Sequence, residues 1–187
     1  MPDNLFKSRE RAFEAVYFAK LDAELIKKIH DKHEAADARD DLANASGISS
    51  EALLDSILEL GVTTSNLEAM GLVPMIWVAW ANGTLTQDEC TAALKVAEAE
   101  GIGQDTPSHL LLETWLAHMP DATLFDTWRE YIASLLGELD APAREQIRKD
   151  VLERAEKIAR ASGGILGVGS ISKKERKVLG EIEAAMS

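Results

Sequence analysis

The sequence predicts an all-α protein, on the basis of its composition and the spacing of its apolar residues. Hydrophobic residues make up 46% of the 187 positions, whereas aromatic residues make up only 5%. Ala, Glu, Leu and Lys are abundant, and these residues lose little side-chain freedom in a helix. No stretch alternates apolar and polar residues long enough to indicate a half-buried strand. We therefore expect a compact bundle of about seven or eight helices around an aliphatic core.

The first segment, residues 1–45, is expected to form a long helical arm. Its apolar stripe fades midway, so the second part should be more exposed. The pattern breaks at Ser46–Ser49, which separates the arm from a helical domain over residues 46–187. The arm could also pair two subunits into a homodimer. The stripe steps by four residues through Phe13, Tyr17, Leu21, Leu25 and Ile29.

Helix signals follow one another closely in the domain. A short helix carrying Leu53 should end at Gly61, because glycine tolerates the positive φ of a helix C-terminus. Thr64 or Ser65 is expected to cap a brief turn that runs through Met70.

The next helix, residues 71–81, is apolar on every side and should therefore be central in the bundle. Pro74 lies near its first position, where the missing N–H costs nothing. The connections between the later helices are short, so neighbouring helices should be roughly antiparallel in the bundle. They are expected between Thr86 and Gly101, Pro107 and Pro120, Leu124 and Leu135, Asp140 and Ala161, and Ser172 and Ala185.

Two segments, residues 82–89 and 168–175, match each other. Each contains a glycine, a hydroxyl residue, an aliphatic residue, a hydroxyl N-cap and a glutamate three positions later. The glycine ends one helix, the aliphatic residue packs before the cap, and the hydroxyl and glutamate form a capping box. The segment is thus a repeated corner between two helices. The aliphatic, N-cap and glutamate positions are Leu85, Thr86 and Glu89, and Ile171, Ser172 and Glu175.

The first corner and its preceding helix, VPMIWVAWANGTLTQDE over residues 73–89, resemble the VAWADG-x-φ-[ST]-x-x-E core of TerB-like proteins, the tellurite-resistance superfamily. GILGVGSISKKE over residues 164–175 resembles the second such corner. The resemblance covers roughly residues 72–186. It implies about seven helices in two pseudo-repeated halves. It also implies a role near stress response or membrane-associated complexes.

Some TerB-like proteins carry an acidic cluster suspected of binding a divalent metal ion. Here Asn82 replaces the usual aspartate of the first corner, and Val168 occupies the second. Each corner keeps one glutamate, so a hard-cation site would be weak. The candidate ligands are Asn82, Asp88, Glu89 and Glu175, and no other cofactor is expected.

Two further segments could bind a ligand, but each also has an ordinary structural explanation. His30, His33, Glu34 and Asp37 share a helical face that could bind Zn²⁺ or Ni²⁺, or could simply be solvated. The glycine-rich segment 163–169 lacks the Lys-Ser/Thr of a phosphate-binding loop, which favours a turn.

Cys90, the single cysteine, excludes an internal disulfide and is expected to be passive, because Asp88 and Glu89 oppose a thiolate. Trp80 is the one tryptophan that could line a groove. The sequence has neither a nucleophile elbow nor strands to carry one, which argues against an enzyme. A polar pocket lined by His109 or His118 with buried carboxylates would favour an enzyme instead.

Charge is distributed unevenly along the chain. The net charge is −12, but residues 40–143 hold seventeen acids against two bases, and residues 144–187 hold ten bases against seven acids. Such an acidic surface repels phosphate backbones, which argues against nucleic acid, and could attract a basic protein partner or serve solubility alone. The longest apolar run, Leu72–Ala81, is too short to span a membrane, so the expected location is the cytoplasm.

The leading hypothesis is a non-catalytic intracellular interaction or stress-associated module of TerB-like type. The alternative is a divalent-metal-binding or metal-responsive domain that uses the Asn82–Glu89 corner.

Overall fold

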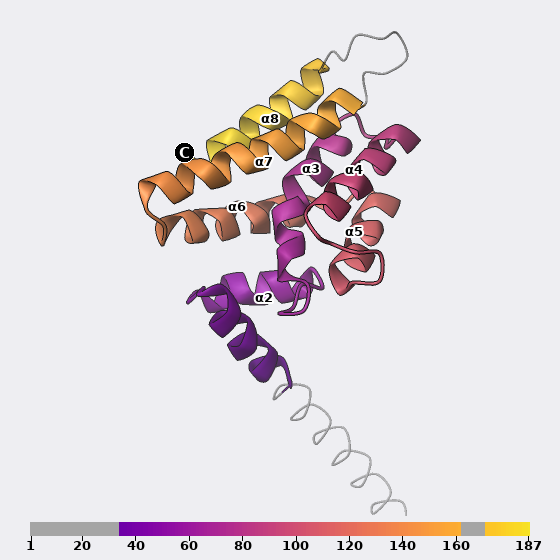
Figure 1. Ribbon diagram of the computed structural model, residues 1–187. Helices are drawn as coiled ribbons and strands as arrows, with labels where there is room; N and C mark the ends of the chain where they lie inside the picture. Colours follow the sequence, from indigo (N-terminus) through magenta and orange to yellow (C-terminus); the bar gives the residue numbers. More distant parts are fainter. Residues whose placement is uncertain (1–33, 162–170) are drawn as a thin grey trace, which may run out of the picture. The chain divides into compact units, whose positions relative to one another are not determined.

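A computed structural model describes residues 34–161 and 171–187 (Figure 1). His30, His33, Val168 and the segment 163–169 lie outside the described residues, as does most of the expected arm. The chain divides into two units, Met1–Asp41 and Leu42–Ser187. Residues 34–46 are helical, and no strand occurs among the described residues, which confirms the all-α prediction.

The helices of the second unit follow the expected order. A 3₁₀ helix, η1, precedes the central helix and forms the brief turn that the sequence indicated. The elements are α2 (Glu51–Glu59), η1 (Leu67–Leu72), α3 (Val73–Ala79), α4 (Gln87–Ala99), α5 (Pro107–Ala117), α6 (Ala122–Gly137), α7 (Ala141–Ala161) and α8 (Lys173–Ala185).

The turn between α2 and η1 differs from the prediction in its cap. Gly61 has a φ of 79° just after α2, as expected of a helix C-terminus. The residue before η1 is Asn66, however, not Thr64 or Ser65. Its Oδ1 accepts a hydrogen bond from the Thr63 backbone N–H at 2.6 Å, and its Nδ2 donates to the Gly61 carbonyl at 3.0 Å. Asn66 thus occupies the N-cap position without a side-chain bond to η1, and its amide instead fixes the turn that leads from Gly61 to the helix.

The central helix of the unit is α3, as its apolar sequence predicts. It contacts α4, α6, α7, α8 and η1. Ile76 and Val78 are completely buried, and Pro74 lies in the first turn of the helix. Because α3 has neighbours on all sides, every one of its faces can be apolar without exposure to water.

Aromatic rings connect α3 to α6. Trp77 stacks on Phe125 with ring centroids 5.1 Å apart, and Phe125 in turn lies 5.3 Å from Trp128. Trp128 is completely buried, as the sequence predicts for a core residue. The start of α6 is capped by Asp121, whose carboxylate accepts the Thr123 N–H at 3.0 Å.

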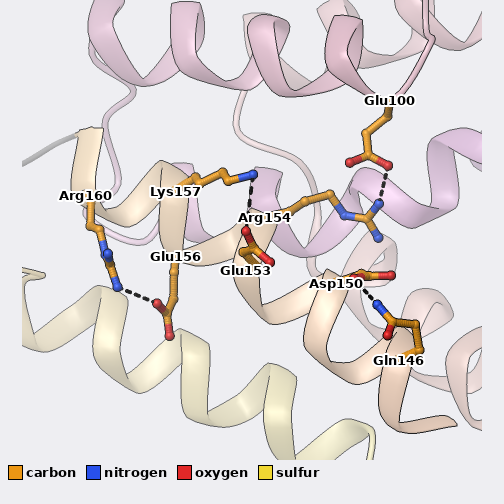
Figure 2. A network of polar contacts seen from close by, with 8 residues as sticks. All are labelled: Glu100, Gln146, Asp150, Glu153, Arg154, Glu156, Lys157 and Arg160. Carbon is orange, nitrogen blue, oxygen red and sulfur yellow. Dashed lines mark hydrogen bonds and ion pairs between the residues drawn. The ribbon is translucent and has the colours of Figure 1, made fainter. Parts of the chain in front are cut away.

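The long helix α7 lies beside α8 and also contacts α3 and α4 (Figure 1). Figure 2 shows its line of polar contacts. Arg154 reaches Glu100 at the end of α4, with Nη1 and Oε2 2.8 Å apart, whereas Arg160 pairs with Glu156 within α7 at 2.7 Å. None of the helices within the described ranges 34–161 and 171–187 is both long and apolar enough to cross a bilayer.

Candidate functional site

The first corner, residues 82–89, has the predicted capping box. The Thr86 hydroxyl accepts the Glu89 N–H at 3.2 Å, and Glu89 Oε2 accepts the Thr86 N–H at 2.7 Å. Gly83 has a φ of 84°, which a residue with a Cβ rarely adopts. Leu85 packs against the core just before the cap. The corner thus reverses the chain between α3 and α4 as its sequence indicates.

The second corner starts α8 in the same way. Ser172 Oγ accepts the Glu175 N–H at 3.2 Å, and Glu175 Oε2 accepts the Ser172 N–H at 2.6 Å. Ile171 packs against the core, in the position that Leu85 occupies in the first corner. The described part of the second corner therefore repeats the first.

The fold brings the two corners into contact. Asn82 Nδ2 donates a hydrogen bond to Glu175 Oε1 at 3.3 Å, across 93 positions of sequence. We call this contact, together with the two capping boxes that it links, Thr86 with Glu89 and Ser172 with Glu175, the corner junction. Glu89 and Glu175 are each only 1% exposed. Buried carboxylates require hydrogen-bond donors, and the helix starts supply them.

The four candidate metal ligands are only partly brought together. Asn82 and Glu175 are in hydrogen-bond contact, Glu89 is buried in its own capping box, and Asp88 is exposed in the first turn of α4. Among the described residues, no group of three or more His, Cys, Asp or Glu side chains is placed to hold a metal ion. At the corner junction, therefore, only the amide of Asn82 and the carboxylate of Glu175 are in contact and could together face a cation.

The two histidines considered for catalysis have different environments. His109 is 5% exposed, its Nε2 lies 3.6 Å from Glu113 Oε1, and its buried Nδ1 has no partner among the described residues. His118 is exposed at the end of α5. The thiol of Cys90 is half-buried and packs against the core.

A groove involves Trp77 rather than the Trp80 that the sequence suggested. Trp80 is half-buried, and its Nε1 donates to the Trp115 carbonyl at 3.0 Å, which ties α3 to α5. Trp77 lines a groove of about 420 Å³ together with Phe125 and α8 residues such as Glu181. Trp80 follows the last residue of α3 and bonds to α5, whereas Trp77 lies within α3 and stacks on Phe125 of α6, so the neighbouring helices decide which ring faces a groove.

A second groove runs along α7 and α8, with a volume of about 520 Å³. Acidic and basic side chains alternate along its walls, among them Glu145, Arg148, Glu153 and Glu183. Because both signs of charge are mixed, this groove selects for neither an anionic nor a cationic ligand.

Two large apolar side chains in and just after α5 are exposed to water, which was not predicted from the sequence. Leu110 is 59% exposed and Met119, just after the helix, is 56% exposed. The exposed acids Glu113 and Asp121 are near them in the chain. The signal was present in the run Leu110–Leu112, because three consecutive residues of a helix cannot all face one core. We call these four residues the α5 surface.

Acidic side chains are exposed over the whole region from α2 to α6. Of the seventeen acids in residues 40–143, all but Asp55, which is half-buried, and Glu89, which is buried, are exposed. Lys95 and Arg129 are the two bases of the same stretch. The apolar residues of the α5 surface thus lie within a strongly negative part of the second unit.

Comparison with protein-family models, with curated proteins and with solved structures gives no match to this chain. The all-α fold and the corner junction therefore define the class of the protein as a helical bundle built around two capped corners.

Proposed function

We propose that this chain is a non-catalytic, cytoplasmic interaction module of TerB-like type that binds a basic, amphipathic segment of a partner protein. The α5 surface carries the proposal, because Leu110 and Met119 are exposed in a stretch of the chain whose charged side chains are nearly all acidic. Apolar anchors provide affinity when they are desolvated, and surrounding charges of one sign select a partner of the opposite sign.

The charge distribution supports a basic partner over nucleic acid. Residues 40–143 hold seventeen acids and two bases, and nearly all of the acids are exposed. A phosphate backbone would be repelled from this face, whereas lysine and arginine side chains would be attracted over roughly a Debye length of about 8–10 Å at physiological salt.

A direct titration tests the proposal. A labelled peptide with lysine and leucine at helical spacing is the probe, and a scrambled peptide of the same composition is the control. We expect the ordered peptide to bind more tightly, with affinity falling as salt is raised because screening weakens the attraction. Equal binding of both peptides would contradict the proposal.

Variants of the α5 surface then locate the binding site. Leu110→Ser and Met119→Ser should each lower the affinity for the peptide by about tenfold, which corresponds to about 1.4 kcal/mol of binding free energy. Leu111→Ser, a half-buried neighbour that packs on the core, is the control for lost stability, and each variant's melting temperature is measured beside its affinity. Unchanged affinity in both α5-surface variants would place the binding elsewhere.

The corner junction favours a second candidate function, the binding of a divalent cation. The 3.3 Å contact joins Asn82 Nδ2 to Glu175 Oε1, and rotation of the amide would turn Oδ1, a hard oxygen ligand like the carboxylate, towards the same point. Two protein ligands leave most of the coordination shell to water, so the affinity would be weak.

Calorimetric titration of metal-stripped protein with Ca²⁺, Mg²⁺ and Zn²⁺ tests this candidate. Binding should release or absorb heat in the native chain and be lost in Glu175→Gln, which keeps an acceptor for the Ser172 N–H. If millimolar metal produces neither heat nor a shift in melting temperature, the metal-binding proposal is wrong.

The homodimer expected of residues 1–45 stays a prediction, which sedimentation of the full chain would check.

A further inference from the structure

The turn after α3 contains the only Asn-Gly pair in the chain. The four asparagines are Asn4, Asn44, Asn66 and Asn82, and only the last is followed by glycine. Both Asn82 and Gly83 are exposed to water. An asparagine followed by glycine is prone to lose ammonia, because the next backbone nitrogen carries no side chain at its Cα to hinder attack on the side-chain amide.

We propose that Asn82 is a site of deamidation, and that this modification breaks the contact between the two corners. The Gly83 nitrogen attacks Cγ of Asn82, so that an N–Cγ bond forms, the Cγ–Nδ2 bond breaks, and ammonia leaves. Water then opens the cyclic imide. Opening at Cγ yields aspartate, whereas opening at the backbone carbonyl yields isoaspartate. No oxidant or reductant takes part.

Two hydrogen bonds restrain the reaction in the native state. The Gly83 N–H donates to the Trp80 carbonyl at 2.8 Å, and Asn82 Nδ2 donates to Glu175 Oε1 at 3.3 Å. Ring closure requires both to open. Nothing lies within 4 Å of where a Cβ of Gly83 would be, so the surroundings leave room for the turn to rearrange. The rate of conversion therefore follows the frequency with which the corner opens.

The chemistry of the product explains why the contact would be lost. An amide nitrogen donates hydrogen bonds, whereas an ionised carboxylate only accepts them. After deamidation, residue 82 would present an acceptor to Glu175 Oε1, which is itself an acceptor on a side chain only 1% exposed. Like-charged groups at this separation repel each other, most strongly where water is excluded. The isoaspartate product also lengthens the backbone by one methylene group within the turn.

The consequence reaches the start of α8. Glu175 Oε2 accepts the Ser172 N–H at 2.6 Å, so the same carboxyl group serves both the capping box and the contact with Asn82. Repulsion at Oε1 therefore acts on the residue that holds the first turn of α8. Deamidation would act as a slow, irreversible loosening of the corner junction as the protein ages.

Peptide mapping by mass spectrometry tests the modification. The full chain is incubated in mildly alkaline buffer and sampled over days. We expect the peptide that contains residue 82 to gain the mass of –NH₂ replaced by –OH, in aspartate and isoaspartate forms. It should convert faster than the peptides with Asn44, which is helical and exposed, and Asn66, which is 7% exposed. Conversion at Asn82 no faster than at Asn44 would overturn the proposal.

Two variants test the consequence. The Asn82→Asp variant should have a melting temperature roughly 2–4 °C below that of the native chain. The melting temperature of the native protein should fall towards that of the variant as the protein ages. Asn82→Gln, whose longer side chain closes a six-membered ring only slowly, should not convert and should keep its melting temperature over the same incubation. An Asn82→Asp variant that melts with the native chain would show that deamidation leaves the corner junction intact.

Discussion

Glu89 and Glu175 are buried carboxylates that each accept a hydrogen bond from the start of their own helix. Each accepts the backbone N–H of its N-cap residue, at 2.7 Å from Thr86 and 2.6 Å from Ser172. Such charge-assisted bonds are short and stronger than those between neutral groups. At the residue scale, these two side chains therefore need no ligand to be stable where they are.

Asp121, which caps α6, offers a prediction of pH dependence. Hydrogen bonds from Thr123 lower the pKa of this carboxyl below its ordinary value of 3.8. The bond from the backbone N–H has the largest effect, and the bond from the side chain comes second. The carboxyl binds a proton less readily when folded than when unfolded, so its contribution to stability is present above pH 3.8 and is lost as the pH falls through the folded pKa.

Thermal melting across the acid range measures this effect. The difference in melting temperature between the native chain and Asp121→Ala should shrink as the pH falls below 3.8. Asp121→Asn keeps an oxygen acceptor without the charge, so its difference from the native chain should be smaller at neutral pH. A difference for Asp121→Ala that stays constant over the whole range would contradict the prediction.

At the scale of the elements, the capping boxes explain where α4 and α8 begin. A hydroxyl N-cap and a glutamate three positions later satisfy two backbone N–H groups that would otherwise lack partners. Both boxes are complete, at Thr86 with Glu89 and at Ser172 with Glu175. The local sequence therefore determines these helix starts without help from the rest of the fold.

We expect Thr86→Ala and Ser172→Ala each to lower the free energy of unfolding by about 1 kcal/mol, the usual cost of losing a hydroxyl cap. Chemical denaturation measures the change. Gln87→Ala, an exposed substitution one position after the first cap, is the matched control and should stay within about 0.5 kcal/mol of the native chain. Equal effects at Thr86 and Gln87 would show that the hydroxyl cap contributes nothing.

At the scale of the whole second unit, stability depends on the burial of α3. Ile76 is completely buried in a helix that contacts five other elements. Shortening such a side chain removes apolar contact and leaves a cavity that the packed neighbours fill only in part.

Ile76→Ala should therefore lower the free energy of unfolding by about 2–5 kcal/mol. Leu110→Ala is the comparison, because Leu110 is 59% exposed and its loss should change stability by less than about 0.5 kcal/mol. Denaturant titration of the two variants measures both values. Similar losses at the two positions would mean that α3 is not the centre of the core.

The elements could be predicted from the sequence because their signals are local. Pro74 and Pro107 lie in the first turns of α3 and α5, and Gly61, Gly83 and Gly101 have the positive φ of helix ends. The cap of η1 was predicted wrongly. Thr64 and Ser65 have the usual residue type of a cap, but the residue before η1 is Asn66, whose side chain bonds back to Gly61 and Thr63 and not to the helix.

The sequence by itself determined the all-α class, the order of the helices and the two capped corners, because each depends on residues within a few positions of one another. Only the tertiary structure decided that Asn82 meets Glu175 across 93 positions, that Trp77 rather than Trp80 lines the groove beside α8, and that Leu110 faces water. These features depend on which helix faces lie together. Contacts between distant segments leave no periodic signal in a single sequence.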